Sequence, residues 1–162
     1  MKIARVVVIS LGLLAAASLA AGQAGLFSGA PPTDLGARDG RLKAPSTTDN
    51  SVSSQAALWP GHPQAAKAAI EPLPAGADGA ATLLRLREII VAMPRARVVE
   101  SRADYLRVEF TTRWMGFIDD AEFWFDPASG TVQVRSASRL GEQDLGVNRQ
   151  RIEALRASLS AR

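Results

Sequence analysis

Residues 105–140 read YLRVEFTTRWMGFIDDAEFWFDPASGTVQVRSASRL, and this stretch decides the fold of the chain. Three runs in it, 105–114, 117–125 and 131–140, alternate apolar with polar residues and are rich in β-branched and aromatic side chains, which is typical of strands. Residues 97–100 predict a fourth strand. The connections between the runs are short, whereas parallel strands need a crossover of about a dozen residues, so the sheet is expected to be antiparallel.

Two turns set the expected register. A four-residue turn over 127–130 places Phe123 opposite Val134. A two-residue turn over 115–116 places Val108 opposite the same Phe123. Both hairpins then collect their apolar residues on one face of the sheet, and we expect this face to form the core.

The opposite face alternates acidic and basic residues. The same registers place Glu109 and Arg135 on either side of Glu122, with Asp120 and Arg139 nearby. One interpretation is a group of three carboxylates that binds a hard cation or divides its pKa values between an acid and a base. The other is a solvent-exposed lattice of cross-strand ion pairs, each worth well under about 1 kcal/mol. The interleaved arginines favour the lattice.

Asp119 differs from these residues because side-chain parity turns it toward the apolar face, beside Thr112 and Ser138. An unpaired buried carboxylate costs several kcal/mol, so we expect Asp119 to be hydrogen-bonded or to lie at an open end of the sheet. Together with Ser136 it marks the place where the core pattern breaks, which is where a site is expected. A structural hydrogen-bond network is the favoured alternative.

Two helices are expected to flank the strands. Residues 78–93 carry apolar residues at helical spacing, with Asp78 as N-cap and Pro94 as the stop. Residues 145–160 show the same spacing, with Asp144 as N-cap. The fold class is therefore predicted to be α+β, a four-stranded antiparallel sheet with an N-terminal and a C-terminal helix packed on one face.

The N-terminus has the pattern of a targeting segment. Lys2 and Arg5 precede the uncharged residues 6–21, and small-x-small patterns occur at 18–20 and 22–24. The uncharged run is shorter than the roughly 20 residues that cross a bilayer, but it reaches that length if it continues to Phe27. The segment is either a cleaved signal peptide or a retained anchor in the inner membrane. Both predict a periplasmic or other extracytoplasmic location.

We divide the chain into three regions: residues 1–24, the signal peptide or anchor; residues 25–77, a flexible tether with short docked segments; and residues 78–162, the α+β domain. The middle region is rich in Pro, Gly, Ser and Ala and is not expected to bury enough apolar surface to fold by itself. His62, the only histidine, falls in it and is expected to be a solvated loop side chain.

Composition excludes several classes of function. The chain has 162 residues and a formal charge of +3 from 19 basic and 16 acidic residues, and without Lys2 and Arg5 the balance is 17 to 16. A nearly neutral domain lacks the basic field that nucleic acid requires. The absence of cysteine excludes disulfides and thiolate chemistry, and a single histidine excludes a Ser-His-Asp triad. No phosphate-binding glycine motif is present, and we predict neither a cofactor nor a metal site.

Residues 139–149 lead from the last strand into the last helix. Helix N-termini favour anions, and Arg139 or Arg149 would reinforce this preference, so a small anionic ligand is one interpretation. The alternative is a capped turn whose arginines pair with Asp119 or Asp120.

Several segments resemble the uncharacterised family called domain of unknown function 1499. The resemblance is carried by FIDDAEF at 117–123, VRSASR at 134–139 and DLGVNR at 144–149. NSVSSQ at 50–55 and IEPL at 70–73 are similar to earlier segments of that family. The resemblance implies that these two earlier segments dock onto the domain and that bacterial and plastid relatives are often exported or attached to membranes.

The chain departs from the family pattern at two positions. Many members have cysteine where this chain has Ser51, and histidine where it has Ala68. Any chemistry that relied on those side chains is not expected here. The resemblance implies no reaction, because the family has no assigned function.

Two functional hypotheses follow. The first is an exported or membrane-tethered, non-catalytic domain that binds a partner protein or a small anionic ligand. The second is a hydrolase in which Asp119 or Asp120 is the general base and arginines hold an anionic group of the substrate. The candidate ligand-binding residues are Asp119, Asp120, Glu122, Arg135, Ser136, Ser138, Arg139, Asn148 and Arg149.

Overall fold

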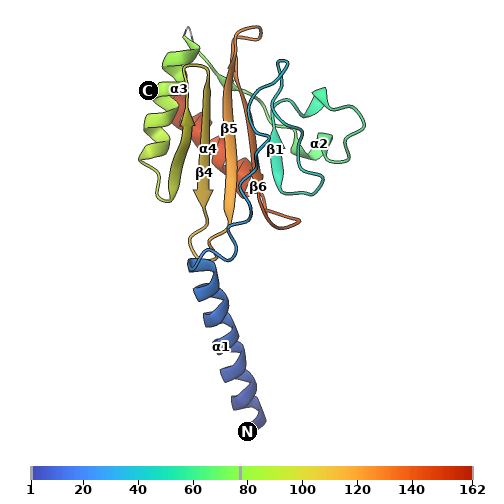
Figure 1. Cartoon of the computed structure of the whole chain (residues 1–162), viewed down its shortest axis with the longest axis vertical. Coiled ribbons are helices and arrows are strands. Elements are labelled where there is room, and N and C mark those ends of the chain that lie inside the picture. Colours follow the sequence, from blue (N-terminus) through green and yellow to red (C-terminus); the bar gives the residue numbers. More distant parts are fainter. Residues whose placement is uncertain (1, 77, 162) are drawn as a thin grey trace.

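The computed structural model describes residues 2–76 and 78–161, and it consists of a long helix and an α+β domain (Figure 1). Helix α1 (Lys2–Gln23) projects from one end of the domain. The remaining elements are, in order, β1 (Ser51–Ser53), the 3-10 helix η1 (Ala56–Leu58), α2 (Ala65–Ala68), β2 (Leu73–Pro74), α3 (Gly79–Val91), β3 (Ala96–Ser101), β4 (Tyr105–Thr111), β5 (Ile118–Asp126), β6 (Thr131–Ser138) and α4 (Val147–Ser160).

The sheet is antiparallel but has six strands, so the prediction of four strands is wrong in number. The strand order is β1-β6-β5-β4-β3, and β2 also pairs with β6. The two additional strands come from residues 50–55 and 70–74, and their docking confirms the implication of the family resemblance. Each is only two or three residues long, which is too short for alternation to be visible in the sequence. That the rest of 25–77 is a flexible tether stays a prediction.

The register of the last hairpin is as predicted. Phe123 faces Val134, and Asp119 faces Ser138. The register between β4 and β5 was predicted wrongly, because Val108 faces Ala121 rather than Phe123. The shift is two residues, so every side chain keeps its predicted face.

The side chain of Thr112 explains this shift. Its Oγ1 accepts a hydrogen bond of 2.9 Å from the backbone N–H of Phe117, and its own N–H donates to the Phe117 carbonyl at 2.8 Å. These two bonds close a loop over residues 113–116 instead of a tight turn at 115–116. Gly116 lies in this loop with a φ of +66°, a conformation that favours glycine.

Helices α3 and α4 cover one face of the sheet, as predicted (Figure 1). Asp78 caps α3 by accepting hydrogen bonds from the N–H groups of Ala80 and Ala81. The N-cap of α4 is Gly146, so the prediction of Asp144 as N-cap is wrong, but the Asp144 carboxylate accepts hydrogen bonds from the N–H groups of Gly146 and Asn148. Both acids therefore satisfy amide groups that the first helical turn leaves unpaired.

The core lies between these helices and the sheet. Leu86, Ile90, Phe123, Val134 and Ile152 are all completely buried in it. Complete burial of such a side chain stabilises a fold by about 1.5–3 kcal/mol, so this apolar face supplies the main driving force for folding.

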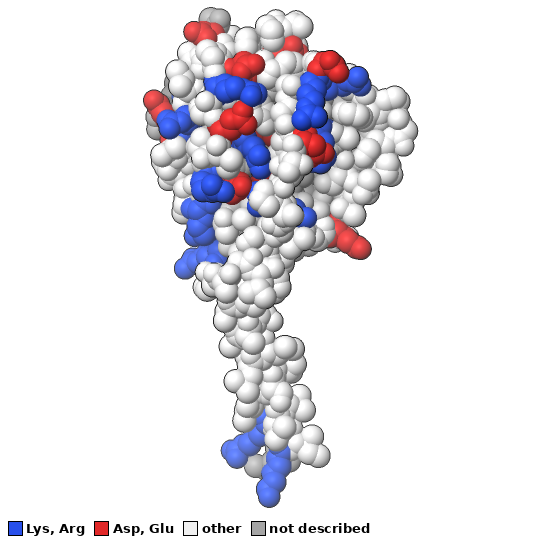
Figure 2. Space-filling view, in the orientation of Figure 1, with Lys and Arg blue, Asp and Glu red and all other residues white. Residues whose placement is uncertain are grey.

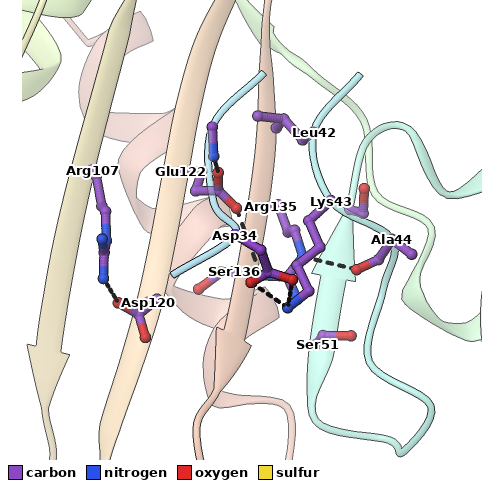
Figure 3. A network of polar contacts seen from close by, with 12 residues as sticks. Asp34, Leu42, Lys43, Ala44, Ser51, Arg107, Asp120, Glu122, Arg135 and Ser136 are labelled. Carbon is purple, nitrogen blue, oxygen red and sulfur yellow. Dashed lines mark hydrogen bonds and ion pairs between the residues drawn. The ribbon is translucent and has the colours of Figure 1, made fainter. Parts of the chain in front are cut away.

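A segment of extended chain covers part of the opposite face of the sheet, and we call residues 34–44 the strap. The N–H of Gly36 donates to Glu122 Oε1 at 2.7 Å, and Arg135 Nε donates to the carbonyl of Ala44 at 2.9 Å (Figure 3). Leu42 of the strap is 1% exposed, and its N–H donates to Gln55 Oε1. The sheet therefore has a cover on both faces.

The end of α1 is seated on the β4–β5 loop. Gly22 is buried, and a Cβ atom at this position would lie 2.5 Å from the carbonyl oxygen of Met115. Gln23 Nε2 donates to the carbonyls of Arg113 and Trp114 at 3.0 and 2.9 Å. The contact requires glycine at position 22 and fixes the point where the helix leaves the domain.

Candidate functional site

The acidic face of the sheet is buried, so the expectation of a solvent-exposed lattice is wrong. Glu109, Asp120 and Glu122 are 5%, 2% and 0% exposed. The strap covers the β6 side of this face (Figure 3), and Arg139 reaches Glu109 of β4. We call these three acids, with Arg135 and Arg139, the charge cluster.

Arginines occupy every oxygen of two of these acids. Arg139 binds Glu109 Oε1 at 2.5 Å and Asp120 Oδ2 at 2.6 Å. Arg97 takes Glu109 Oε2, and Arg107 takes Asp120 Oδ1. The hydrogen bonds to Asp120 raise the pKa of the Arg139 guanidinium, and burial opposes this rise. These carboxylates therefore have no oxygen left for a hard cation.

Glu122 is held differently, mainly by neutral groups. Its Oε1 accepts from the Tyr105 hydroxyl at 2.8 Å as well as from Gly36, while Oε2 lies 3.7 Å from Arg135 Nη1 without a hydrogen bond. Burial and the adjacent Glu122 charge raise the pKa of Tyr105 above its usual range. Burial lowers the pKa of Arg135, and the Glu122 charge opposes this. The charge cluster is therefore a structural part of the domain interior.

Within residues 2–76 and 78–161, no group of three or more His, Cys, Asp or Glu side chains is placed to hold a metal ion. The three acids of the charge cluster are interleaved with arginines on adjacent strands. The arrangement offers positive charge where a cation would have to bind.

A second polar group lies on the helix-covered face, and we call Asp119, Ser136, Ser138, Asn148 and Arg151 the inner polar cluster. Asp119 is 3% exposed, and its Oδ2 accepts from Arg151 Nη2 at 2.6 Å. Asn148 Oδ1 accepts from Arg151 and Ser136, and its amide donates to Ser138 Oγ at 3.1 Å. The inward orientation of Asp119 beside Ser138 is confirmed, as is its place in a hydrogen-bond network.

Sequence reasoning did not select Arg151. Its guanidinium lies over the ring of Phe110, 4.5 Å from the ring centroid, and forms the ion pair with Asp119. One signal was available: Arg151 follows Asn148 by three residues and therefore shares its helix face, which is a buried face. A charge on that face requires a buried partner, and Asp119 supplies it.

A cavity of about 350 Å³ opens beside the inner polar cluster, between the β4–β5 loop and the start of α4. Most of its wall is apolar and comes from Trp114, Met115, Phe117, Leu140, Leu145 and Val147. The polar part of the wall includes Asp119, Ser138 and Thr112. With Asp144 and Arg113 also in its wall, the cavity combines an apolar chamber with two carboxylates, a guanidinium and two hydroxyl groups, a usual composition for a small-molecule site.

The predicted site residues do not come together in one place. Asp120, Glu122, Arg135 and Arg139 belong to the charge cluster, and Asp119, Ser136, Ser138 and Asn148 to the inner polar cluster on the other face of the sheet. Arg149 lies apart from both, and its Nη2 donates to the carbonyl of Lys67 at 2.8 Å. The expected pairing of Arg139 with Asp120 is present.

The fold and this cavity define an α+β domain in which a six-stranded antiparallel sheet carries two helices on one face and an extended strap on the other. The family model described as "Protein of unknown function (DUF1499)" matches residues 41–159, so the chain belongs to that family. No curated protein and no solved structure matches the chain.

Proposed function

We propose that this chain is a membrane-anchored, extracytoplasmic binding domain without catalytic activity, and that the cavity beside Asp119 holds a small ligand with an apolar body. The observation that carries the proposal is the position of this mainly apolar cavity at the end of the domain where α1 is attached.

Helix α1 supports retention in a membrane. Among the described residues it is the one helix long and apolar enough to cross a bilayer, and at about 1.5 Å per residue it approximates the roughly 30 Å hydrocarbon core. Its basic residues, Lys2 and Arg5, lie at the end away from the domain (Figure 2). The positive-inside rule then places the domain outside the cytoplasm.

The contacts at the end of α1 favour an uncleaved anchor. Cleavage at the small-x-small site of residues 22–24 would remove the helix that Gly22 seats on Met115. It would also disturb the two hydrogen bonds that Gln23 makes to the β4–β5 loop. A signal peptide that is removed by cleavage would not require a close contact of this kind with the domain.

The lining of the cavity supports a neutral polar group on the ligand, because its acids are accompanied by Arg113. The acids Asp119 and Asp144 both line it, and the charge of Asp119 is balanced by Arg151. An apolar body would contact Phe117 and Leu140, while a donor on the ligand would meet Asp119 or Ser138. Matching of buried polar atoms in this way fixes the orientation of a ligand.

A hydrolase is the second candidate, because Asp119 lines the cavity beside the Ser138 hydroxyl. Asp120 lies on the other face of the sheet and is bound by Arg107 and Arg139, so only Asp119 would serve as general base for this cavity. Hydrolysis of a short-chain p-nitrophenyl ester that is lost in Asp119→Asn and kept in the exposed Asp104→Asn would favour this candidate.

Binding is tested with the full chain in amphipol and the neutral fluorophore N-phenyl-1-naphthylamine, whose emission rises in apolar surroundings. We expect a saturable rise for the native chain, loss of the rise in Leu140→Arg, and retention in Leu84→Arg. Leu84 is 62% exposed on α3 and does not line the cavity, so it is a matched control. The absence of saturable binding by the native chain, or equal binding by the Leu140 variant, would contradict the proposal.

A further inference from the structure

We infer that the end of the domain around α1 rests on the lipid bilayer and inserts Leu26, Trp114, Leu140 and Leu145 into its interface. The inference rests on the proposed function, because it requires α1 to remain in the membrane. It adds a second membrane contact, made by the folded domain itself.

These four side chains are exposed and gather at one end of the domain. Leu26, Trp114, Leu140 and Leu145 are 69%, 63%, 42% and 86% exposed. The last three line the same cavity, and Leu26 lies three residues after the end of α1. Figure 2 shows mainly uncharged surface where α1 meets the domain on this side. Contiguous exposed apolar side chains of this kind mark an interaction surface.

Leu145 is the most informative of them. It has a φ of +54°, in the left-handed region that glycine or asparagine usually occupies. Neither the backbone nor the core explains a leucine here, because the residue is strained and is 86% exposed. A leucine side chain is stabilised when it leaves water, and the hydrocarbon boundary of a bilayer would provide an apolar environment for it. This stabilisation explains the presence of leucine at position 145.

The seat of α1 places the surface at the height of the bilayer boundary. Gln23, in the last turn of α1, binds the backbone carbonyls of Arg113 and Trp114, so these residues lie level with the end of the membrane helix. The Arg113 guanidinium stacks on the Trp114 ring, 4.7 Å from its centroid. Tryptophan is enriched at membrane interfaces, and arginine reaches from there to lipid headgroups.

The charges near Leu145 at this end of the domain are partly paired, because Lys67 binds Asp49 at 2.5 Å. The exposed Glu142 lies in the loop before α4, and the carboxylate of Asp144 is occupied by helix N–H groups. Arg113 supplies positive charge near the surface of anionic lipids. A bilayer is thus a better match for this surface than a strongly charged partner.

The absence of native cysteine makes site-specific labelling straightforward. The full chain is reconstituted in liposomes of phosphatidylcholine and phosphatidylglycerol, with a nitroxide at Leu145→Cys. Matched labels are placed at Leu13→Cys, within α1, and at Ala128→Cys, in the β5–β6 turn at the far end of the sheet (Figure 1). Collision of each label with oxygen and with a water-soluble nickel chelate is measured by electron paramagnetic resonance.

We expect the ratio of oxygen to nickel collisions at position 145 to be several-fold higher than at 128 and to approach the ratio at 13. A ratio at 145 equal to that at 128, with a lipid-exposed label at 13, would overturn the docking and leave the anchor intact. A water-exposed label at 13 would overturn the anchor and the docking with it. A label at 145 that neither reagent reaches indicates a protein neighbour and also overturns the docking. Leu26→Cys provides a second position for the same measurement.

Discussion

Asp119 and Asp120 are neighbours in β5, yet they belong to opposite kinds of environment. Asp120 accepts hydrogen bonds from two arginines on the face of the charge cluster. Asp119 has one oxygen bound by Arg151 and lines a cavity on the other face. The density of charge therefore does not locate the candidate site, because the charge-rich face is internally satisfied and the other face has a carboxylate that lines a cavity.

Removal of Glu122 should have the largest effect. Glu122→Ala leaves the buried Arg135 without its nearest acid and removes the acceptor of the Tyr105 hydroxyl. Breaking a buried ion pair from one side costs about 3–5 kcal/mol. We expect the free energy of unfolding in urea to fall by about this amount.

The double variant Glu122→Leu with Arg135→Leu is the matched control. It removes both charges, so it should cost less than the sum of the two single changes. A loss below about 1 kcal/mol for Glu122→Ala would show that the charge cluster does not hold the sheet and strap together.

Asp119→Ala should have an intermediate effect. Arg151 loses its ion pair but keeps its hydrogen bond to Asn148, and its side chain is 10% exposed. We expect a loss of about 1–3 kcal/mol, measured by thermal and urea unfolding. Asp119→Asn keeps the shape and an acceptor and should cost less; an unchanged melting temperature for Asp119→Ala would exclude the network role of Asp119.

Tyr105 gives the charge cluster a dependence on alkaline pH. Its pKa is raised in the folded chain above the usual 10.0, because burial and Glu122 oppose ionisation. The contribution to stability is complete below pH 10, and it declines as the pH rises above 10 toward the folded-state pKa. The free energy of unfolding should fall as the pH rises above 10, by about 1.4 kcal/mol for each pH unit.

In Tyr105→Phe the stability at pH 8 should drop by about 1 kcal/mol through loss of the hydrogen bond to Glu122, but the tyrosine-dependent decline should disappear. Equal pH slopes for the native chain and this variant would contradict the interpretation.

The smallest effect is expected at the outer edge of the strap. Lys43 binds Asp34 at 2.7 Å on the surface and lowers the pKa of that carboxyl. Its stabilising contribution is present above the ordinary Asp pKa and is lost as the pH falls through the lower folded value. Lys43→Met should lower the free energy of unfolding at pH 7 by less than about 0.5 kcal/mol. A loss comparable to that of Glu122→Ala would mean that this surface ion pair, and not the charge cluster, holds the strap on the sheet.

The strand faces and the last register were predictable because they depend on side-chain alternation and on one turn over residues 127–130. The β4–β5 register was not, because it depends on the side chain of Thr112 bonding to the Phe117 backbone. Propensity contains no information about that single contact. The error was harmless to the faces because a shift of two preserves parity.

The burial of the charge cluster could not be predicted from the sequence, for a different reason. The strap binds Glu122 and Arg135 through a backbone N–H at Gly36 and a backbone carbonyl at Ala44. Every residue except proline carries these two groups, so the residue types in the strap gave no indication of what it covers. The cavity was equally hidden, because it lies between two loops whose relative position depends on the seat of α1.

The contact between the end of α1 and the β4–β5 loop determines how the domain is oriented relative to α1. The backbones of Gly22 and Gly116 are in contact, so no space for a side chain remains between the end of α1 and the β4–β5 loop. A domain joined to its helix by a flexible linker would sample many orientations relative to that helix. Here the contact fixes the direction in which α1 leaves the domain, and a side chain added at either glycine would displace the helix.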